Sequence, residues 1–276
     1  MDKKQTDSLP LTRRSQILYF IKEEPSLLFF VNFTAAFFFV PLAFVFTWGI
    51  LSYSSIAIKE GVTNSECFAS ILYPSLALVP ATMISGIGMC GVYSVISRLI
   101  LRSTSPYSTF WKGIKDNWRQ FLLTYSILGI LLSLLFINIG VYYYVDLSVT
   151  TKLVSLIVVS ILLVLFLFIK HFVLFQITLF NNSYLLILRN SIGFIGKRFL
   201  YNLLALLISN VMYVIILFTP GWFKVIPIVL IAAYWIMFSS LVNYVICIDT
   251  LELKLPRELT QEFYHRGLDQ DEEPII

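Results

Sequence analysis

Long apolar stretches without charged residues alternate with short polar segments along most of this chain. A helix that crosses a lipid bilayer needs about 20 predominantly apolar residues, so each stretch is long enough to cross once. Six such helices are predicted, at residues 25–58, 71–101, 121–145, 153–172, 199–219 and 225–248. A polar tail (1–24) precedes them and an acidic tail (249–276) follows. The pattern therefore predicts an all-α, polytopic membrane protein with its transmembrane domain over residues 25–248.

The segment between the second and third predicted spans is both aromatic and basic. Ser105 and Pro106 are residues typical of a helix start. One side of such a helix carries Phe110, Trp111, Ile114, Trp118 and Phe121, and the other carries Lys112, Lys115, Asp116 and Arg119. A helix divided in this way lies in the plane of a membrane interface, with its rings toward lipid. We therefore predict an interfacial helix over residues 105–120, and a second, weakly basic one over 184–198.

Composition and charge support a membrane location and indicate an orientation. Charged residues make up 13% of the chain, against about 25% in soluble domains. Sixteen of the 20 Lys and Arg residues lie in the two tails or in the segments between spans two and three and between spans four and five. Only Lys59, Lys152 and Lys224 lie in the other loops. Because cytoplasmic loops carry the excess of cations, both termini are predicted to be cytoplasmic.

Small residues are concentrated in the second predicted span. The pattern Gly86-x-Gly88-x-x-Gly91 has the spacing of a dinucleotide-binding motif. That motif needs a preceding strand and a soluble helix, and a membrane span offers neither. Close approach of neighbouring helices is the better interpretation of these small residues. The predicted helix-packing residues are Pro80, Ala81, Thr82, Gly86, Gly88 and Gly91.

Polar residues inside the predicted spans are few. Lys170 and His171 lie near the end of the fourth span, and they act either as an interfacial anchor or as part of a pore or proton path. Interhelical hydrogen bonding is expected for five asparagines, Asn32, Asn138, Asn202, Asn210 and Asn243. No acidic residue lies deep in a span, which argues against a proton- or sodium-coupled transporter.

Catalytic and metal-binding motifs are missing from the predicted spans. No nucleophile motif, zinc-binding motif or carboxylate pair lies at membrane depth. The three cysteines, Cys67, Cys90 and Cys247, are far apart and form neither a disulfide framework nor a metal motif. We therefore predict a protein that is not an enzyme and needs no cofactor.

The cations of residues 105–120 have two main interpretations. They either anchor the segment beside anionic lipid or bind a protein partner. Nucleic acid is disfavoured, because rings that point toward lipid cannot stack on bases. The predicted partner-binding residues are Phe110, Trp111, Lys112, Lys115, Asn117, Trp118, Arg119 and Gln120.

About 40 residues of this chain resemble the YesL family of bacterial membrane proteins. The resemblance lies in Pro80-Ala81-Thr82, in Tyr93 and Arg98, and in the run from Phe110 to Gln120. The chain departs from the family in its long first span, in residues 59–70 and in Val79, where a glycine often stands. The resemblance implies a location in the bacterial cytoplasmic membrane and an association with carbohydrate uptake, beside the permease of an ABC importer or a sensor.

Two functions are therefore expected from the sequence. The first is a non-enzymatic accessory or regulatory membrane protein, because the basic aromatic segment occurs without a catalytic or ion-binding set. The alternative is a small facilitator or channel for a neutral solute. It is suggested by the asparagines, by the prolines of the second span and by a faint parallel repeat. A shift of 78 residues aligns Ile114 with Ile192 and Phe121 with Phe199.

Overall fold

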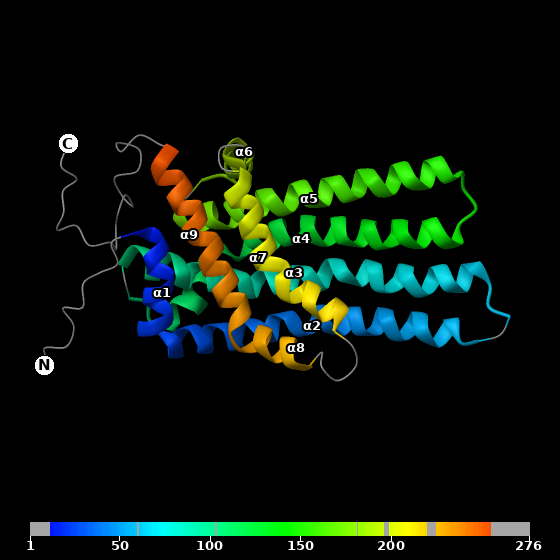
Figure 1. Ribbon diagram of the computed structural model, residues 1–276, viewed down its shortest axis with the longest axis horizontal. Helices are drawn as coiled ribbons and strands as arrows, with labels where there is room; N and C mark the ends of the chain where they lie inside the picture. The colour runs from blue at the N-terminus through cyan, green and yellow to red at the C-terminus, as the bar shows by residue number, and fades with distance from the viewer. Residues whose placement is uncertain are drawn as a thin grey trace, which may run out of the picture.

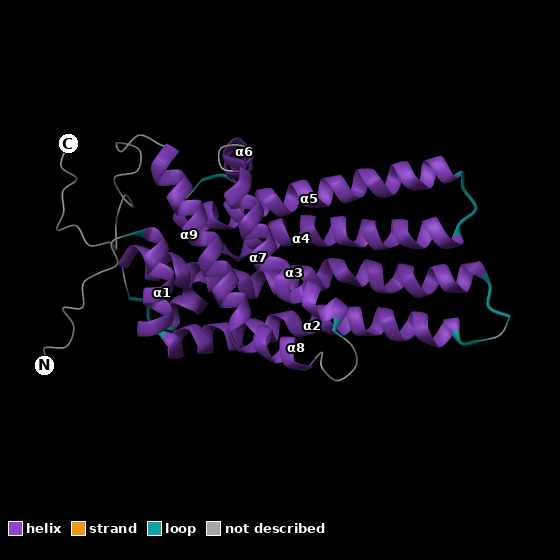
Figure 2. Cartoon of the chain, in the orientation of Figure 1, coloured by secondary structure: helices purple, strands orange, loops and turns teal. Residues whose placement is uncertain are grey.

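The computed structural model describes residues 12–59, 61–102, 104–180, 182–195, 199–219 and 225–254, which form helices joined by short loops (Figure 1). The described residues contain no strand (Figure 2). The elements in chain order are α1 (Arg13–Glu23), α2 (Pro25–Ala57), α3 (Asn64–Arg102), α4 (Ser108–Tyr144), α5 (Val149–Leu179), α6 (Tyr184–Ile195), α7 (Phe199–Phe218), α8 (Val225–Leu230), the π-helical turn η3 (Ile231–Trp235) and α9 (Ile236–Lys254). The chain is an all-α, polytopic membrane protein, as the hydrophobic pattern predicts.

Four long helices, α2 to α5, form one antiparallel layer in chain order (Figure 1). They contain 33, 39, 37 and 31 residues. At 1.5 Å per residue each is about 45 Å long or more, which exceeds the bilayer core of about 30 Å. The α2–α3 and α4–α5 loops lie at the same end. There the hydroxyl oxygens of Tyr53 and Tyr144 are 2.7 Å apart, as expected for tyrosines at a membrane interface.

The remaining helices form a second layer. Helices α7 and α9 are inclined to the four long helices, and the ends of α7 and α8 reach only part of the way along them (Figure 1). Helix α9 contacts α2, α3, α5 and α7, so it closes one side of the first layer. Both α1 and the end of α9 lie at the end of the molecule that also holds the α3–α4 loop (Figure 1).

Five helices in the described part of the chain are long and apolar enough to cross a membrane, where the pattern predicts six. They are Pro25–Ile56, Asn64–Arg102, Ser108–Tyr144, Val149–Leu179 and Ile226–Glu252. The predicted span at residues 199–219 corresponds to α7, which has 20 residues. Its apolar helix among the described residues, Asn202–Met212, is too short by itself to cross a bilayer. A helix is therefore present at the predicted sixth position, and it is shorter than the four long helices and inclined to them (Figure 1).

The predicted separate interfacial helix over residues 105–120 is wrong. Helix α4 begins at Ser108 and runs without interruption to Tyr144, because the sequence between them contains no proline. Tyr107 occupies the N-cap position, and no side chain caps the helix. The rings do not all face lipid either: Phe110 and Phe121 are fully buried against the rest of the protein.

The second predicted amphipathic segment, 184–198, does contain a separate helix. Helix α6 covers Tyr184–Ile195, and residues 196–198 lie outside the described part of the chain. Figure 1 shows α6 almost end-on, so it lies across the direction of the long helices. The two copies of the predicted repeat therefore differ, because the first forms one helix and the second forms two.

Small residues of α3 lie where its neighbours come closest. A Cβ atom built on Gly88 would lie 2.7 Å from Cβ of Phe38 on α2, and one built on Gly91 would overlap the ring of Phe110 on α4. Ala81 and Thr82 are also buried, whereas Pro80 is exposed. Helix α3 continues through Pro74 and Pro80 without a break. The prolines therefore do not interrupt the span that the small residues hold against α2 and α4.

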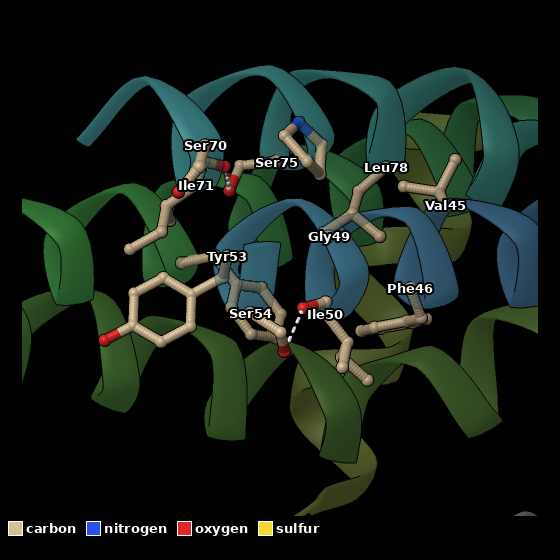
Figure 3. A pocket seen from close by; sticks show the side chains of 12 residues that line it. Val45, Phe46, Gly49, Ile50, Tyr53, Ser54, Ser70, Ile71, Ser75 and Leu78 are labelled. Atoms are coloured by element: carbon tan, nitrogen blue, oxygen red, sulfur yellow. Dashed lines mark hydrogen bonds between the residues drawn. The ribbon is translucent and has the colours of Figure 1, made fainter. Parts of the chain in front are cut away.

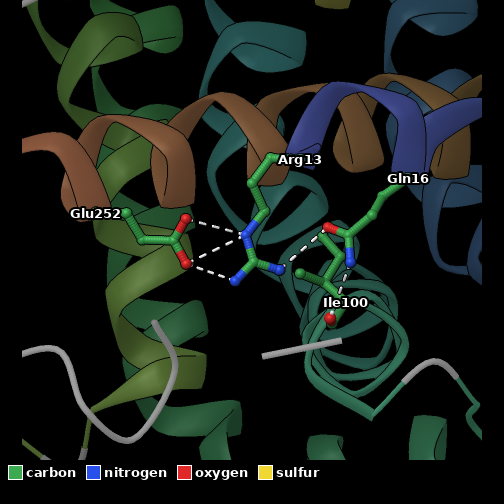
Figure 4. Close-up of polar contacts among 4 residues, drawn as sticks. All are labelled: Arg13, Gln16, Ile100 and Glu252. Atoms are coloured by element: carbon green, nitrogen blue, oxygen red, sulfur yellow. Dashed lines mark hydrogen bonds and ion pairs between the residues drawn. The ribbon is translucent and has the colours of Figure 1, made fainter. Parts of the chain in front are cut away.

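The first helix belongs to the folded protein, although residues 1–24 were predicted to be a tail. Phe20 of α1 is fully buried, and Arg13 forms a buried ion pair with Glu252 near the end of α9 (Figure 4). The Arg13 Nη2 atom lies 2.5 Å from Glu252 Oε1. Gln16 accepts a hydrogen bond from Arg13 and donates one to the carbonyl oxygen of Ile100 on α3. These contacts join α1, α3 and α9 at one end of the molecule.

Candidate functional site: a cavity between two helix layers

A cavity of about 240 Å³ lies between the first layer and the inclined helices. Helices α2, α3, α4, α5, α7 and α9 all contribute residues to its wall. Its polar and aromatic lining consists of Phe39, Thr82, Ser85, Tyr93, Tyr125, Lys170, His171, Ser209, Asn210, Ser239, Ser240 and Asn243. A volume of this size is equivalent to several water molecules at about 30 Å³ each, so the cavity can hold a small solute.

Lys170 and His171 are the basic residues of this cavity. The Lys170 Nζ atom lies 5.8 Å from the centre of the Tyr125 ring, within range of a cation–π contact. The His171 side chain is buried, and neither ring nitrogen has a hydrogen-bond partner among the described residues. Lys170 is about 14 Å from the end of α5 along the helix at 1.5 Å per residue. Both side chains belong to the cavity wall.

Asn243 of α9 faces the same cavity with one atom unpaired. Its Nδ2 atom donates a hydrogen bond of 2.5 Å to Ser209 Oγ on α7. Its Oδ1 atom has no partner among the described residues. The Ser85 and Ser240 hydroxyls donate to backbone carbonyls of their own helices, so their oxygens remain able to accept. Buried polar atoms usually have a partner, which points to water or a solute here.

A π-helical turn lies beside the cavity. Residues 231–235 form this turn, and Ile236, the first residue of α9, is part of the cavity wall. Asn32 of α2 donates from Nδ2 to the Ile231 carbonyl oxygen at 2.9 Å and accepts from the Met237 backbone N–H at 2.8 Å. A π turn shifts the helical hydrogen-bond ladder, and Asn32 supplies partners at both ends. The predicted interhelical role of this asparagine is confirmed.

Three of the other asparagines divide between two roles. Asn138 of α4 accepts a hydrogen bond from Ser155 of α5, and Asn243 bonds to Ser209, so both join neighbouring helices. Asn210 instead donates to the Leu206 carbonyl of its own helix and lines the cavity. A sequence cannot separate these roles, because both place a polar group away from lipid.

The predicted partner-binding residues of α4 do not share one surface. Phe110 is fully buried and cannot contact a partner, while Asn117 and Gln120 are half-buried. The Gln120 amide donates to the carbonyl oxygen of Asn182 at 3.3 Å. The exposed members of the set are Trp111, Lys112, Lys115, Trp118 and Arg119. The Arg119 guanidinium lies 5.5 Å from the centre of the Trp118 ring.

A second hollow, nearer the α2–α3 loop, has a different chemistry. It is a groove of about 250 Å³ between α2 and α3, lined mostly by apolar side chains (Figure 3). The hydroxyls of Ser54, Ser70 and Ser75 all donate to carbonyls of their own helices. The Tyr53 hydroxyl lies 2.7 Å from that of Tyr144, and none of the unpaired buried atoms of the described structure belongs to this groove. The groove is therefore suited to apolar contact with lipid, and the central cavity to a polar solute.

Sequence reasoning identified Lys170, His171, Asn210 and Asn243 but did not group them. The cavity also takes hydroxyls from α3, α7 and α9 that were not predicted to line a solute site. Adjacent polar pairs within apolar stretches, Ser209-Asn210 and Ser239-Ser240, are a signal that could have located these segments.

The fold and the cavity define a class of protein: a polytopic α-helical membrane protein with an internal polar cavity between two helix layers. Comparison with known protein families, curated proteins and solved structures finds no match for this chain. The resemblance to the YesL family therefore remains a prediction.

Proposed function

We propose that this protein is a small-solute facilitator, which admits a small polar solute to the cavity between its helix layers and allows it to cross the membrane. One observation carries the proposal: six helices contribute residues to one cavity that contains unpaired polar atoms. A polar group inside a membrane is costly unless it has a hydrogen-bond partner or binds a solute. A cavity wall built from so many helices also suits alternating access, because tilting of one layer against the other changes every side of the cavity.

Flux through the purified protein tests this proposal. We expect proteoliposomes that contain only this chain to equilibrate a small solute faster than empty liposomes, measured by light scattering after an osmotic jump. A panel of small alcohols, sugars, carboxylates and phosphates should contain at least one solute with protein-dependent flux. Equal rates with and without protein for the whole panel would overturn facilitation.

A matched pair of variants connects flux to the cavity. Ser85→Phe adds a ring to the cavity wall, so we expect it to reduce protein-dependent flux at least about tenfold. Leu134→Phe adds bulk on the exposed face of α4, outside the cavity, and should leave flux within about twofold. Overfilling a well-packed site costs about 1–3 kcal/mol of stability, so size-exclusion profiles must match before rates are compared.

An accessory role is the second candidate, and the exposed surface of α4 favours it. Trp111, Trp118 and three cations lie on this surface, and tryptophan and arginine are enriched in protein interfaces. The partner expected from the sequence resemblance is the permease of a carbohydrate ABC importer or a sensor. Neither this role nor facilitation requires catalysis by the protein.

Co-purification tests the accessory role. Wild-type protein extracted in mild detergent should retain an importer permease or sensor that mass spectrometry identifies. The variant Lys112→Glu/Lys115→Glu/Arg119→Glu should lose it, because charge reversal across an interface is repulsive. Lys22→Glu, on the exposed side of α1, is the control and should retain it. Retention by the triple variant would contradict docking through this surface.

A further inference from the structure

We infer that the central cavity binds a small soluble anion that also carries a hydrogen-bond donor, such as a hydroxycarboxylate or a hydrogen phosphate. This inference rests on the proposed function, because it names the solute class of the same cavity. It departs from the neutral solute expected from the sequence.

The charge of the cavity wall is the first observation. Lys170 contributes an ammonium group and His171 an imidazole, and the described lining residues include no Asp or Glu. Lys170 is half-buried, and a cation withdrawn from water is costly unless a counter-charge lies near it. The Tyr125 ring offers a weak cation–π contact at 5.8 Å, which is no substitute for a negative charge. An anionic solute would supply the missing counter-charge.

The unpaired atoms of the wall are the second observation, independent of charge. His171 is 7% exposed, and the Nδ1 and Nε2 atoms of its ring both lack partners in the described structure. Asn243 is 4% exposed, and its Oδ1 atom is an unpaired acceptor. An imidazole N–H and an ammonium donate to anionic oxygens, whereas Asn243 Oδ1 needs a donor from the solute. A solute with an anionic oxygen and a hydroxyl satisfies both.

Three related probes separate charge from hydrogen bonding. Lactate has a carboxylate and a hydroxyl, propionate has only the carboxylate, and 1,2-propanediol has no charge. We expect lactate and inorganic phosphate to raise the unfolding temperature of the purified full-length chain at constant ionic strength. Propionate should bind at least about threefold more weakly than lactate, and 1,2-propanediol should have no effect.

Two variants assign the binding to the cavity. Lys170→Gln removes the cation and should weaken lactate or phosphate binding at least about tenfold. Asn243→Asp keeps the shape of the side chain and places a carboxylate in the cavity, so it should weaken anion binding by a similar factor without loss of the fold. Lys112→Gln removes an exposed cation outside the cavity and should bind as wild type does.

The outcomes separate this inference from facilitation. Binding of lactate or phosphate that is lost in Lys170→Gln and Asn243→Asp supports the inference, even if no flux is observed. Flux of a neutral solute with no binding of either anion would overturn the inference and leave facilitation standing. The same measurements in nanodiscs of phosphatidylcholine, with and without phosphatidylglycerol, test whether an anionic lipid headgroup is the ligand. Stabilisation that requires phosphatidylglycerol and no added solute would overturn the inference in favour of a lipid headgroup.

Discussion

Arg13 and Glu252 are 239 positions apart in the chain and form an ion pair with both side chains buried. Figure 4 shows that Gln16 extends this contact to the backbone of α3, so one cluster joins three helices. The sequence predicted neither residue for this role, because each lies in a segment that reads as a polar tail. A charged residue near a chain end has no partner that spacing or periodicity can reveal.

The buried ion pair yields a prediction for stability. Glu252→Gln leaves the Arg13 guanidinium buried without its counter-charge, so we expect it to lower the free energy of unfolding in detergent by about 3 kcal/mol. Lys22→Met removes an exposed cation of the same helix, which faces Glu23 at 3.7 Å, and should cost at most about 1 kcal/mol. Denaturant titration followed by circular dichroism measures both. If the two substitutions lower the free energy of unfolding equally, the buried ion pair stabilises the protein no more than an exposed one does.

Phe110 and Trp111 show that periodicity does not reveal whether an apolar side chain faces lipid or the protein interior. Both lie on the apolar side of the predicted helix, yet Phe110 is fully buried and Trp111 is 51% exposed. In a membrane protein, lipid and the protein interior are both apolar, so hydrophobicity does not distinguish them. The contacts of Phe110 decide the matter, because it packs against Gly91 of α3 and its ring centre lies 6.4 Å from that of Phe38 on α2.

At the scale of elements, the π-helical turn before α9 depends on one asparagine of α2. Asn32→Leu removes both hydrogen bonds to this turn, so we expect it to lower the free energy of unfolding by about 1–3 kcal/mol. Thr47→Val is the control on the same helix, because its exposed hydroxyl bonds only to the Ala43 carbonyl. Thermal unfolding in detergent compares the two variants. If they are equally stable, Asn32 does not hold the turn.

The boundaries of elements were predicted less well than their existence. Helix α4 continues from Ser108 through the predicted boundary at Gln120, because an amphipathic pattern and an apolar pattern can both belong to one helix. Helices α5 and α6 instead separate near Asn182 and Ser183, where the sequence has turn-forming residues. Turn-forming residues therefore located the boundary between α5 and α6. The sequence directly around Gln120 has no such residues, and α4 continues there.

At the scale of the whole molecule, Lys59 and Lys112 lie at opposite ends of the long helices. Cation counting predicts that the end with Lys112 is cytoplasmic. In intact cells, a membrane-impermeant maleimide should label Lys59→Cys and should label Lys112→Cys only after permeabilisation. The parent for both variants is a chain in which Cys67, Cys90 and Cys247 are replaced by alanine, and it should remain unlabelled. Labelling of both positions in intact cells would contradict the predicted topology.

The sequence by itself determined that this chain forms apolar helices long enough to cross a membrane. The reason is local: inside lipid every backbone N–H and C=O must be paired, and a helix pairs them within one segment. The tertiary structure alone decided that α7 and α9 lie inclined on the layer of α2 to α5. It also decided that Lys170, His171 and Asn243 face one cavity. Apolar helices carry little information about their neighbours, because side chains that face lipid and side chains that face protein have the same chemistry.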